Sequence, residues 1–522
     1  MPWKLLTIAA VAVVVQSAPG EVHAQVQAAG NGGAPRDPWR FGSSIGVDET
    51  YSDNINLSPA GRERSDFVTS IVPSLTVTRF GPRLTTTLSY QPQLLLYANG
   101  TNGTQFRNSL NAIANGSVIE NFLFFDAAAN ISQQNISPFG TQAANTVNGS
   151  TNRAETRNYT FGPTLQSRYD RDLQYSAGYR YSQSNADSGA YATSHTSTLF
   201  GQFQSSTSFR DVGFGGAVNR TDQEYGGINE IVTESVNGNV TYVLQPTLHL
   251  QGNVGYDRNR YPTTGQAELQ GVSYSGGFNW QPSHHTSVNA QVGHRYFGPT
   301  ANVSIQQTTA RFVVSATYTR DQTTSNATGI SQVQDPNYAL IDQFYRATIT
   351  DPVQRQQAVV AALQQAGLST SQFGNQGFLS NQLFLQKRAD VSVGLLGLHN
   401  TITFDANRSE VQSLSAITAG FDVFDQASRF QTTSISANLN HRLGPRMSVN
   451  FTAQKIHNSA IEGRGDTRQR QLVVSVNRQF QPKLSGTVLY RNTSQTGNNS
   501  TAGFYGGNYR ENAVLGSLRL TF

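Results

Sequence analysis

Few residues in this chain have the type and spacing needed for nucleophilic or metal chemistry. Residues 42–46 read Gly-Ser-Ser-Ile-Gly, the pattern of a serine nucleophile, but that chemistry requires a strand-to-helix turn, and the residues that follow predict no helix. His284 and His285 lack both the His-x-x-x-His spacing and the carboxylate of a zinc site. His195, with Ser194 or Ser197, is the nearest candidate for a hydrolase. We predict no enzyme, no metal and no cofactor.

The composition narrows the class of protein that must position such residues. Of 522 residues, 13% are charged and 10% aromatic, the formal net charge is +5, and there is no Cys. The aromatic content argues against a disordered chain, and the lack of Cys excludes a disulfide scaffold and a thiol nucleophile. Beyond the N-terminus no apolar run is long enough for a membrane helix. Strands with one wet face and one apolar face fit this composition.

The N-terminus has the three parts of a secretory signal peptide. Lys4 precedes the apolar run 5–15, and Val22-His23-Ala24 ends it with a small-residue cleavage pattern. We predict a signal peptide over 1–24, cleaved after Ala24, and a flexible periplasmic lead-in over 25–40. A membrane anchor is the alternative, but the apolar run is short for one. Export then delivers the chain to the bacterial outer membrane.

From residue 41 onward, apolar and polar residues alternate with a period of two, as in 248–257 and 272–280. Short connections such as Gln281-Pro282 alternate with long polar segments such as 135–154, as expected for periplasmic turns and external loops of a membrane barrel. We therefore predict an all-β, transmembrane, antiparallel up-and-down β-barrel over 41–522. We expect twenty-two strands, or twenty if 301–309 and 311–322 are not a pair. The expected strands are 42–54, 66–79, 83–97, 106–118, 122–134, 155–169, 172–185, 194–208, 211–223, 231–244, 247–260, 270–281, 286–297, 301–309, 311–322, 383–397, 400–412, 429–443, 447–457, 467–480, 484–494 and 509–522.

Two features of the barrel sequence stand apart from the strand pattern. Phe522 ends an amphipathic strand, which predicts a recognition signal for the barrel-assembly machinery. The long loop insert 324–382 breaks the alternation, and Pro352 to Gly367 reads as a helix with a stop at Gly367. This partly helical insert would either enter the lumen as a constriction or pack as an external loop.

The polar face of the strands predicts the lumen wall. Placing it inward points five arginines and two aspartates into the lumen: Arg180, Arg295, Arg442, Arg491, Arg519, Asp257 and Asp405. Amide and hydroxyl groups between them would bind hydroxylated solutes, and the arginines would favour anions. No cluster of basic and aromatic residues predicts nucleic-acid binding.

The expected width of the barrel bears on how it transports. Known barrels of about 22 strands carry a plug, and about 17 residues between Ala24 and the first strand are too few for a folded one. We therefore expect either an open conduit or a lumen narrowed by inward loops, rather than an energy-coupled receptor.

Two stretches, VDETYSDNINL at 47–57 and NISQQNISPFG at 130–140, resemble the PEP-CTERM system-associated outer-membrane proteins and the broader β-barrel porin group related to them. The resemblance implies an outer-membrane barrel associated with exopolysaccharide production and exosortase systems. It also implies exopolysaccharide and periplasmic export components as partners, besides outer-membrane lipid. It carries no catalytic residues over to this chain.

Three hypotheses for the function follow. The first is a passive conduit for exopolysaccharide or another hydrophilic solute. The second is a non-transporting structural barrel that anchors polymer at the surface. The third is a barrel hydrolase that depends on His195.

Overall fold

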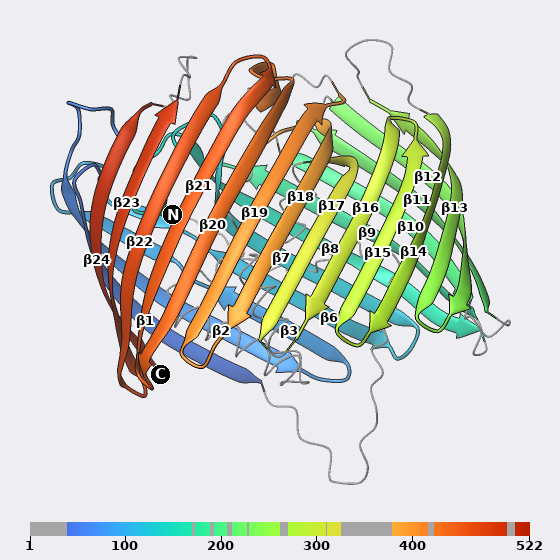
Figure 1. The fold of residues 1–522 in the computed structure, drawn as a ribbon, viewed down its shortest axis with the longest axis horizontal. Helices are drawn as coiled ribbons and strands as arrows, with labels where there is room; N and C mark the ends of the chain where they lie inside the picture. The colour runs from blue at the N-terminus through green and yellow to red at the C-terminus, as the bar shows by residue number, and fades with distance from the viewer. Residues whose placement is uncertain are drawn as a thin grey trace, which may run out of the picture.

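The chain folds into one closed antiparallel β-barrel. The computed structural model describes residues 39–169, 173–187, 193–205, 211–226, 229–261, 270–309, 311–324, 378–415, 422–497 and 507–522. Each strand pairs with its neighbour in the sequence, and the last strand pairs with the first, which closes the sheet (Figure 1). The predicted signal peptide and the predicted helix of the insert lie outside the described residues.

The wall contains 22 strands, as predicted, built from 24 strand segments. The break at Gln91-Pro92 divides the third strand, because Pro has no N–H to donate to the sheet, and the fourth strand is divided opposite it at Asn108-Ser109. The segments are β1 (Arg40–Ser52), β2 (Asp66–Phe80), β3 (Leu84–Tyr90), β4 (Gln93–Tyr97), β5 (Gln105–Arg107), β6 (Leu110–Ile119), β7 (Leu123–Asn135), β8 (Arg153–Tyr169), β9 (Leu173–Ala186), β10 (Ser194–Ser205), β11 (Val212–Tyr225), β12 (Asn229–Gln245), β13 (Leu248–Arg260), β14 (Gln270–Ser283), β15 (Thr286–Arg295), β16 (Gly298–Thr308), β17 (Phe312–Thr324), β18 (Leu383–Leu396), β19 (Asn400–Ser413), β20 (Arg429–Gly444), β21 (Met447–Glu462), β22 (Asp466–Gln481), β23 (Leu484–Gly497) and β24 (Tyr509–Thr521).

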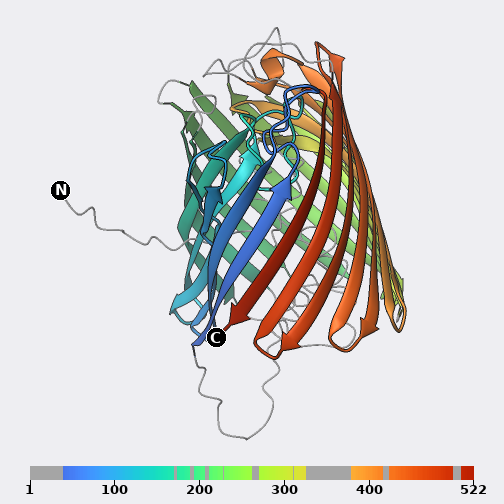
Figure 2. The same ribbon diagram turned by 90° about the vertical axis from the view of Figure 1, so that its left-hand side faces the viewer.

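The two ends of the barrel differ, as the alternation of short and long connections predicted. The C-terminus and the start of β1 lie at one end, with tight turns such as Pro445-Arg446 and Pro482-Lys483. In Figure 2 this end is at the bottom, and loops coloured blue to teal gather at the opposite end. We call the end with the long loops the outer mouth, because bacterial barrels place their long loops outside the cell.

Two connections differ from the prediction. The predicted turn at Gln281-Pro282 lies within β14, which continues to Ser283 because Gln281 N–H still donates to Thr247 C=O at 2.7 Å. The turn falls at His284-His285 instead. At the outer mouth, β15 and β16 are joined by Tyr296-Phe297 alone.

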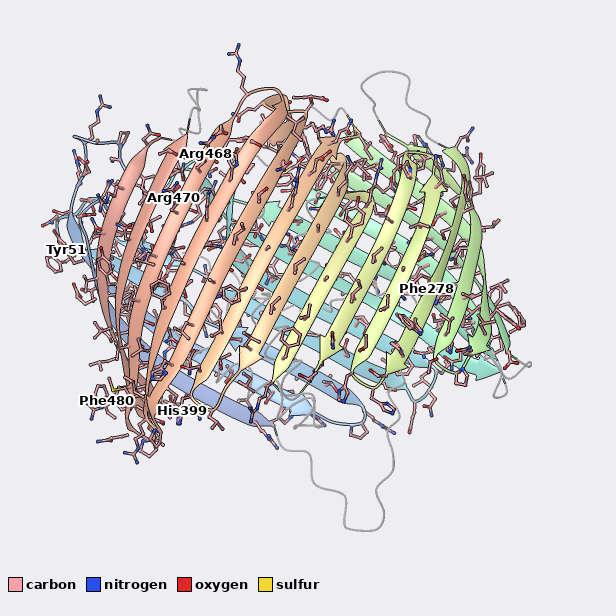
Figure 3. All side chains as sticks on the ribbon, viewed as in Figure 1. Tyr51, Phe278, His399, Arg468, Arg470 and Phe480 are labelled. Carbon is pink, nitrogen blue, oxygen red and sulfur yellow. The ribbon has the colours of Figure 1, made fainter. Side chains whose placement is uncertain are left out.

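The pleat of each strand gives the barrel an apolar outside and a polar inside. Val254, Val272 and Val488 are each more than 60% exposed on the outside, where a membrane would cover them. Figure 3 shows side chains projecting from the wall, with Phe278 labelled on one of the strands. Along β24, Leu518 and Leu520 point outward and Arg519 between them points inward. Within the described residues no helix is long and apolar enough to cross a membrane.

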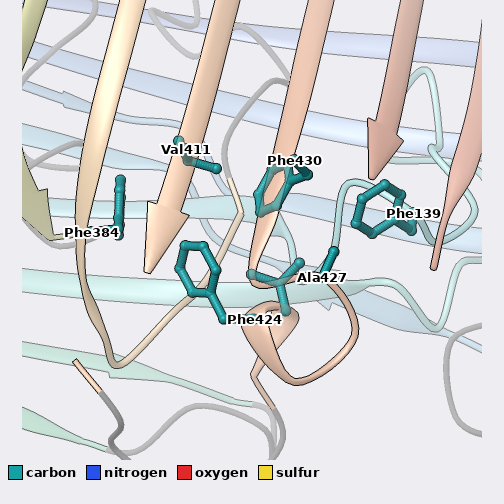
Figure 4. Close-up of a cluster of buried hydrophobic side chains, with 7 residues drawn as sticks. Phe139, Phe384, Val411, Phe424, Ala427 and Phe430 are labelled. Atoms are coloured by element: carbon teal, nitrogen blue, oxygen red, sulfur yellow. The ribbon is translucent and has the colours of Figure 1, made fainter. Parts of the chain in front are cut away.

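Most of the buried apolar side chains form clusters at the outer mouth, where loops pack against the inner faces of the strand ends. One further cluster lies within the wall, around Ala112, Ala128 and Ala129 on β6 and β7. Figure 4 shows one of the clusters at the mouth, with Phe139 from one loop beside Phe430 on β20. The loops at the mouth are thus fixed to the wall by apolar packing.

Candidate functional site: a cap across the outer mouth

Segments from distant parts of the sequence meet across the outer mouth. We call them the outer cap and define it as residues 53–58, 136–152, 378–383 and 422–428. The segment 136–152 leaves the wall between β7 and β8 and reaches β20, although eight wall strands lie between β7 and β20 on the shorter way round. Its Ile136 C=O accepts a hydrogen bond from Leu379 N–H at 3.2 Å. The segments therefore touch each other as well as the wall.

Polar side chains of the inner wall hold the backbone of 136–152. Asn458 Nδ2 and Thr467 Oγ1 donate to Pro138 C=O at 2.8 and 3.0 Å. Gln495 donates to Gly140 C=O at 3.2 Å and accepts from Gln142 N–H at 2.9 Å. These wall side chains are buried, so removing the side chain of Gln495 would leave Gln142 N–H buried without its acceptor.

A buried ion pair anchors the other end of the same segment. Arg491 Nη2 on β23 lies 3.0 Å from Glu511 Oε1 on β24, and their side chains are 6% and 0% exposed. Asn148 bonds both partners: its Nδ2 donates to Glu511 Oε1 at 2.6 Å, and its Oδ1 accepts from Arg491 at 3.3 Å. Ser52 Oγ also donates to Glu511, at 2.8 Å. The charges thus bind the cap rather than face water.

Apolar side chains hold 136–152 at separate points. Phe139 is fully buried, with its ring centroid 5.4 Å from that of Phe430. Val147 packs among Ile55, Val68, Leu95 and Tyr97. Burying apolar groups on both sides of the mouth favours a fixed position for the segment.

Two residues shape the segment from within. Asn152 accepts from Ser137 N–H at 2.8 Å and donates back to Ser137 C=O at 2.8 Å. A Cβ on Gly140 would lie 2.4 Å from Asn152 Cγ, so the approach of the two residues requires glycine.

The second half of the cap is built around Asp422. Its carboxylate accepts from Ser380 Oγ at 2.8 Å, Asn381 N–H at 2.9 Å and Phe424 N–H at 3.0 Å. The last bond caps η1 (Val423–Asp425). Burial raises the pKa of Asp422 to about 6, against the opposing effect of these donors.

The seven residues predicted to line the lumen do not form one site. Arg491, on β23, binds the outer cap through Asn148. Arg295 on β15 pairs with Asp257 on β13 at 2.9 Å and with Asp321 on β17 at 3.1 Å. The other four lie apart: Arg180 above the Phe200 ring at 5.3 Å, Asp405 beside Ser436 Oγ at 3.4 Å, Arg519 next to Gly46 and Arg442 exposed near the inner end. Arg491 is neutralised by Glu511, and Arg295 and Asp257 neutralise each other. This pairing weakens the predicted preference of the lumen for anions.

From the sequence, 324–382 was expected to be either a constriction in the lumen or an external loop, and 135–154 was expected to be an external loop. The structure shows 136–152 inside the mouth instead, and of 324–382 it describes Thr324 and 378–382. The stretches 47–57 and 130–140, which carry the family resemblance, both reach the cap: Gly149 N–H donates to Ile55 C=O at 3.0 Å. These two stretches were the sequence signal that could have located the outer cap.

The hydrolase candidate is not assembled as an active site. His195 Nδ1 lies 2.8 Å from the hydroxyl of Tyr181 on the outer face. Ser197 lies 3.0 Å from the hydroxyl of Tyr179, and Ser194 is buried on the opposite face of β10. Among the described residues no three His, Asp or Glu side chains form a group that could hold a metal ion.

Comparison with known proteins supports the architecture. The FrpB iron transporter from Neisseria meningitidis (F5-1 variant) matches with a TM-score of 0.50 at 10% identity, over 92% of this chain and 82% of that one. Its apoprotein form matches equally well over 94% of this chain and 82% of that one, at 10% identity and a TM-score of 0.50. The siderophore receptor PirA from Acinetobacter baumannii matches at 9% identity with a TM-score of 0.46, over 92% and 80%. No protein-family model and no curated protein matches the chain. The fold is that of the outer-membrane transport barrels. At identities this low, the similarity shows the fold alone.

Proposed function

We propose that the protein is an outer-membrane conduit for a hydrophilic solute, and that the outer cap sets what can pass. The observation that carries the proposal is the cap itself: 136–152 lies across the mouth of a polar-walled barrel. A wall that offers amides and hydroxyls exchanges hydrogen bonds with hydroxylated solutes at little cost, because each lost bond to water is replaced.

The family resemblance suggests exopolysaccharide as the solute. A hydroxyl-rich polymer suits a lumen wall of amides and hydroxyls in which Arg295, Asp257 and Arg491 are paired with opposite charges. Iron and siderophore transport, the activities named for the similar structures, would use the same barrel architecture, but the likeness to those proteins is one of fold alone.

A solute-flux assay tests this proposal. The full chain is refolded into liposomes, and swelling is measured in neutral oligosaccharides of increasing length, for the protein as it stands and with 139–149 deleted. We expect the deletion to raise the largest oligosaccharide that enters. The control deletes 264–267 from the connection between β13 and β14, which contributes no residue to the outer cap, and should leave that size unchanged.

Two outcomes would contradict the proposal. If neither protein admits any oligosaccharide, the alternative of a non-transporting barrel that anchors polymer is favoured. If the deletion leaves the size limit unchanged while flux is present, 136–152 is not the constriction.

A further inference from the structure

A group of basic side chains faces outward near the outer mouth, on the side of the barrel formed by β19 and β21–β24. We call it the basic rim patch and define it as Arg408, Lys455, Arg468, Arg470 and Arg510, all of them exposed. Figure 3 shows Arg468 and Arg470 at the end of the wall opposite Phe480 and His399. These side chains face the surroundings of the barrel, not its lumen.

The strand register fixes the height of the patch above the apolar band. Lys455 pairs with Arg470, Arg470 with Ser494, and Ser494 with Arg510, so these residues form one row across four strands. Four residues further down each strand, Phe451, Val474, Tyr490 and Val514 form an apolar row in the same register. Four residues of strand span about 13 Å. Because strands in such barrels are tilted, the vertical separation is smaller, a height above the apolar row that fits the headgroup level of an outer leaflet.

The charge of the patch is not balanced by the protein. Within the described residues, Asp466 is the one carboxylate that lies within ion-pair distance of any of these five cations. It lies 3.4 Å from Arg468 and also 3.0 Å from His457. Lys455 and Arg470 lie directly opposite each other on neighbouring strands, an arrangement of like charges that is unfavourable without an anion nearby.

Two other outward-facing cations near the outer mouth lie within ion-pair distance of carboxylates. Arg220 lies 3.1 Å from Asp222 and 3.0 Å from Glu234, and Arg157 lies 2.6 Å from Glu155. A position at the rim therefore does not by itself leave a cation without a carboxylate partner.

A hollow lies beside the patch and offers a seat for an anionic group. It is lined by Asp466, Arg468, Thr496, Gly497 and Asn508, at the outer ends of β22–β24. A guanidinium, a hydroxyl and an amide can together donate several hydrogen bonds to phosphate oxygens.

We propose that the basic rim patch binds the phosphate groups of a glycolipid in the outer leaflet, the lipid A of lipopolysaccharide. The occupant must be anionic because of the charge, and it must be an amphiphile because the apolar row below the patch is covered by acyl chains. This binding site is separate from the lumen and does not depend on the conduit proposed above.

Binding of diphosphoryl lipid A to the purified full-length protein in detergent tests the proposal. The variant Lys455→Gln/Arg468→Gln/Arg470→Gln should bind at least tenfold more weakly, since each cation near an anionic surface contributes about fivefold. The matched control Arg157→Gln/Arg220→Gln/Arg258→Gln removes three outward cations elsewhere and should bind within twofold of the unchanged protein. Heat-dependent electrophoretic mobility verifies that each barrel is folded.

Two further probes identify the recognised group. Dephosphorylated lipid A should bind at least tenfold more weakly than the diphosphoryl form, and phosphatidylglycerol should not compete at equal concentration. The proposal is overturned if the patch variant binds as tightly as the unchanged protein, if the control loses as much, if removing the phosphates has no effect, or if phosphatidylglycerol binds equally well.

Discussion

Replacing Glu511 by Gln should release 136–152 from the mouth. In the unchanged protein Glu511 is fully buried and pairs with Arg491, and Asn148 bonds both. Removing one member of a buried pair costs about 3–5 kcal/mol, because the remaining charge is left without a partner. When the segment lifts away, water from the mouth reaches Arg491 and removes that cost. The substitution therefore shifts the balance toward the released state.

The lower figure suits this pair, because Arg491 keeps the oxygen of Asn148 as a partner. About 3 kcal/mol corresponds to an increase of about a hundredfold in the released fraction, at 1.4 kcal/mol for each factor of ten. A thiol placed on the segment reports this fraction. The chain has no Cys, so Ala143→Cys, at a position only 3% exposed between Leu57 and Tyr509, is the only site that a maleimide can label.

Labelling of Ala143→Cys should accelerate about a hundredfold when Glu511→Gln is added, and the further change Arg491→Met should reverse part of the increase. Asp257→Asn is the matched control: it removes a buried inward carboxylate that also pairs with an arginine, Arg295, but away from the cap. A folded Glu511→Gln barrel that labels within threefold of its parent would refute this reasoning, as would an equal acceleration by Asp257→Asn.

Three further predictions concern the cap and the C-terminus. Gly140→Val should also expose position 143 to labelling, because its Cβ would collide with Asn152; the same rate as the parent would show that the segment adjusts. The pKa of Asp422 is about 6 in the folded protein and about 3.8 in the unfolded chain, so the contact between Asp422 and 378–382 gains stability as the pH falls from 7 to 5 and loses it as the pH rises. Hydrogen exchange of the amides of 378–382, corrected for its intrinsic pH dependence, should therefore be slower at pH 5 than at pH 7. Asp422→Asn should remove this difference. Phe522→Ala should slow insertion by the barrel-assembly machinery but not spontaneous refolding in detergent; equal slowing of both would assign Phe522 a structural role instead.

The wall of the barrel could be predicted from the sequence because its cause is local. The pleat alternates side chains between lipid and lumen, so period-two runs predicted the strands, including the pair 301–309 and 311–322 that the structure places in β16 and β17. The inward direction of Arg519 follows in the same way, from Leu518 and Leu520 on either side of it.

The cap could not be predicted because its contacts join residues far apart in the sequence. Phe139, in the connection between β7 and β8, meets Phe430 on β20, and nothing local to either residue predicts the other. Asn148 and Gln142 are amides like those of any external loop, and their pairing with wall residues leaves no trace in the composition. Arg491 was predicted to face the lumen, but its partner Glu511 depends on the register of β23 and β24.

Single-channel conductance in planar bilayers tests the central claim, that the outer cap narrows a polar conduit. The refolded full chain should conduct in small, steady steps, and deletion of 139–149 should give steps several times larger. Steps of the same size from both proteins, with both barrels folded, would contradict the claim.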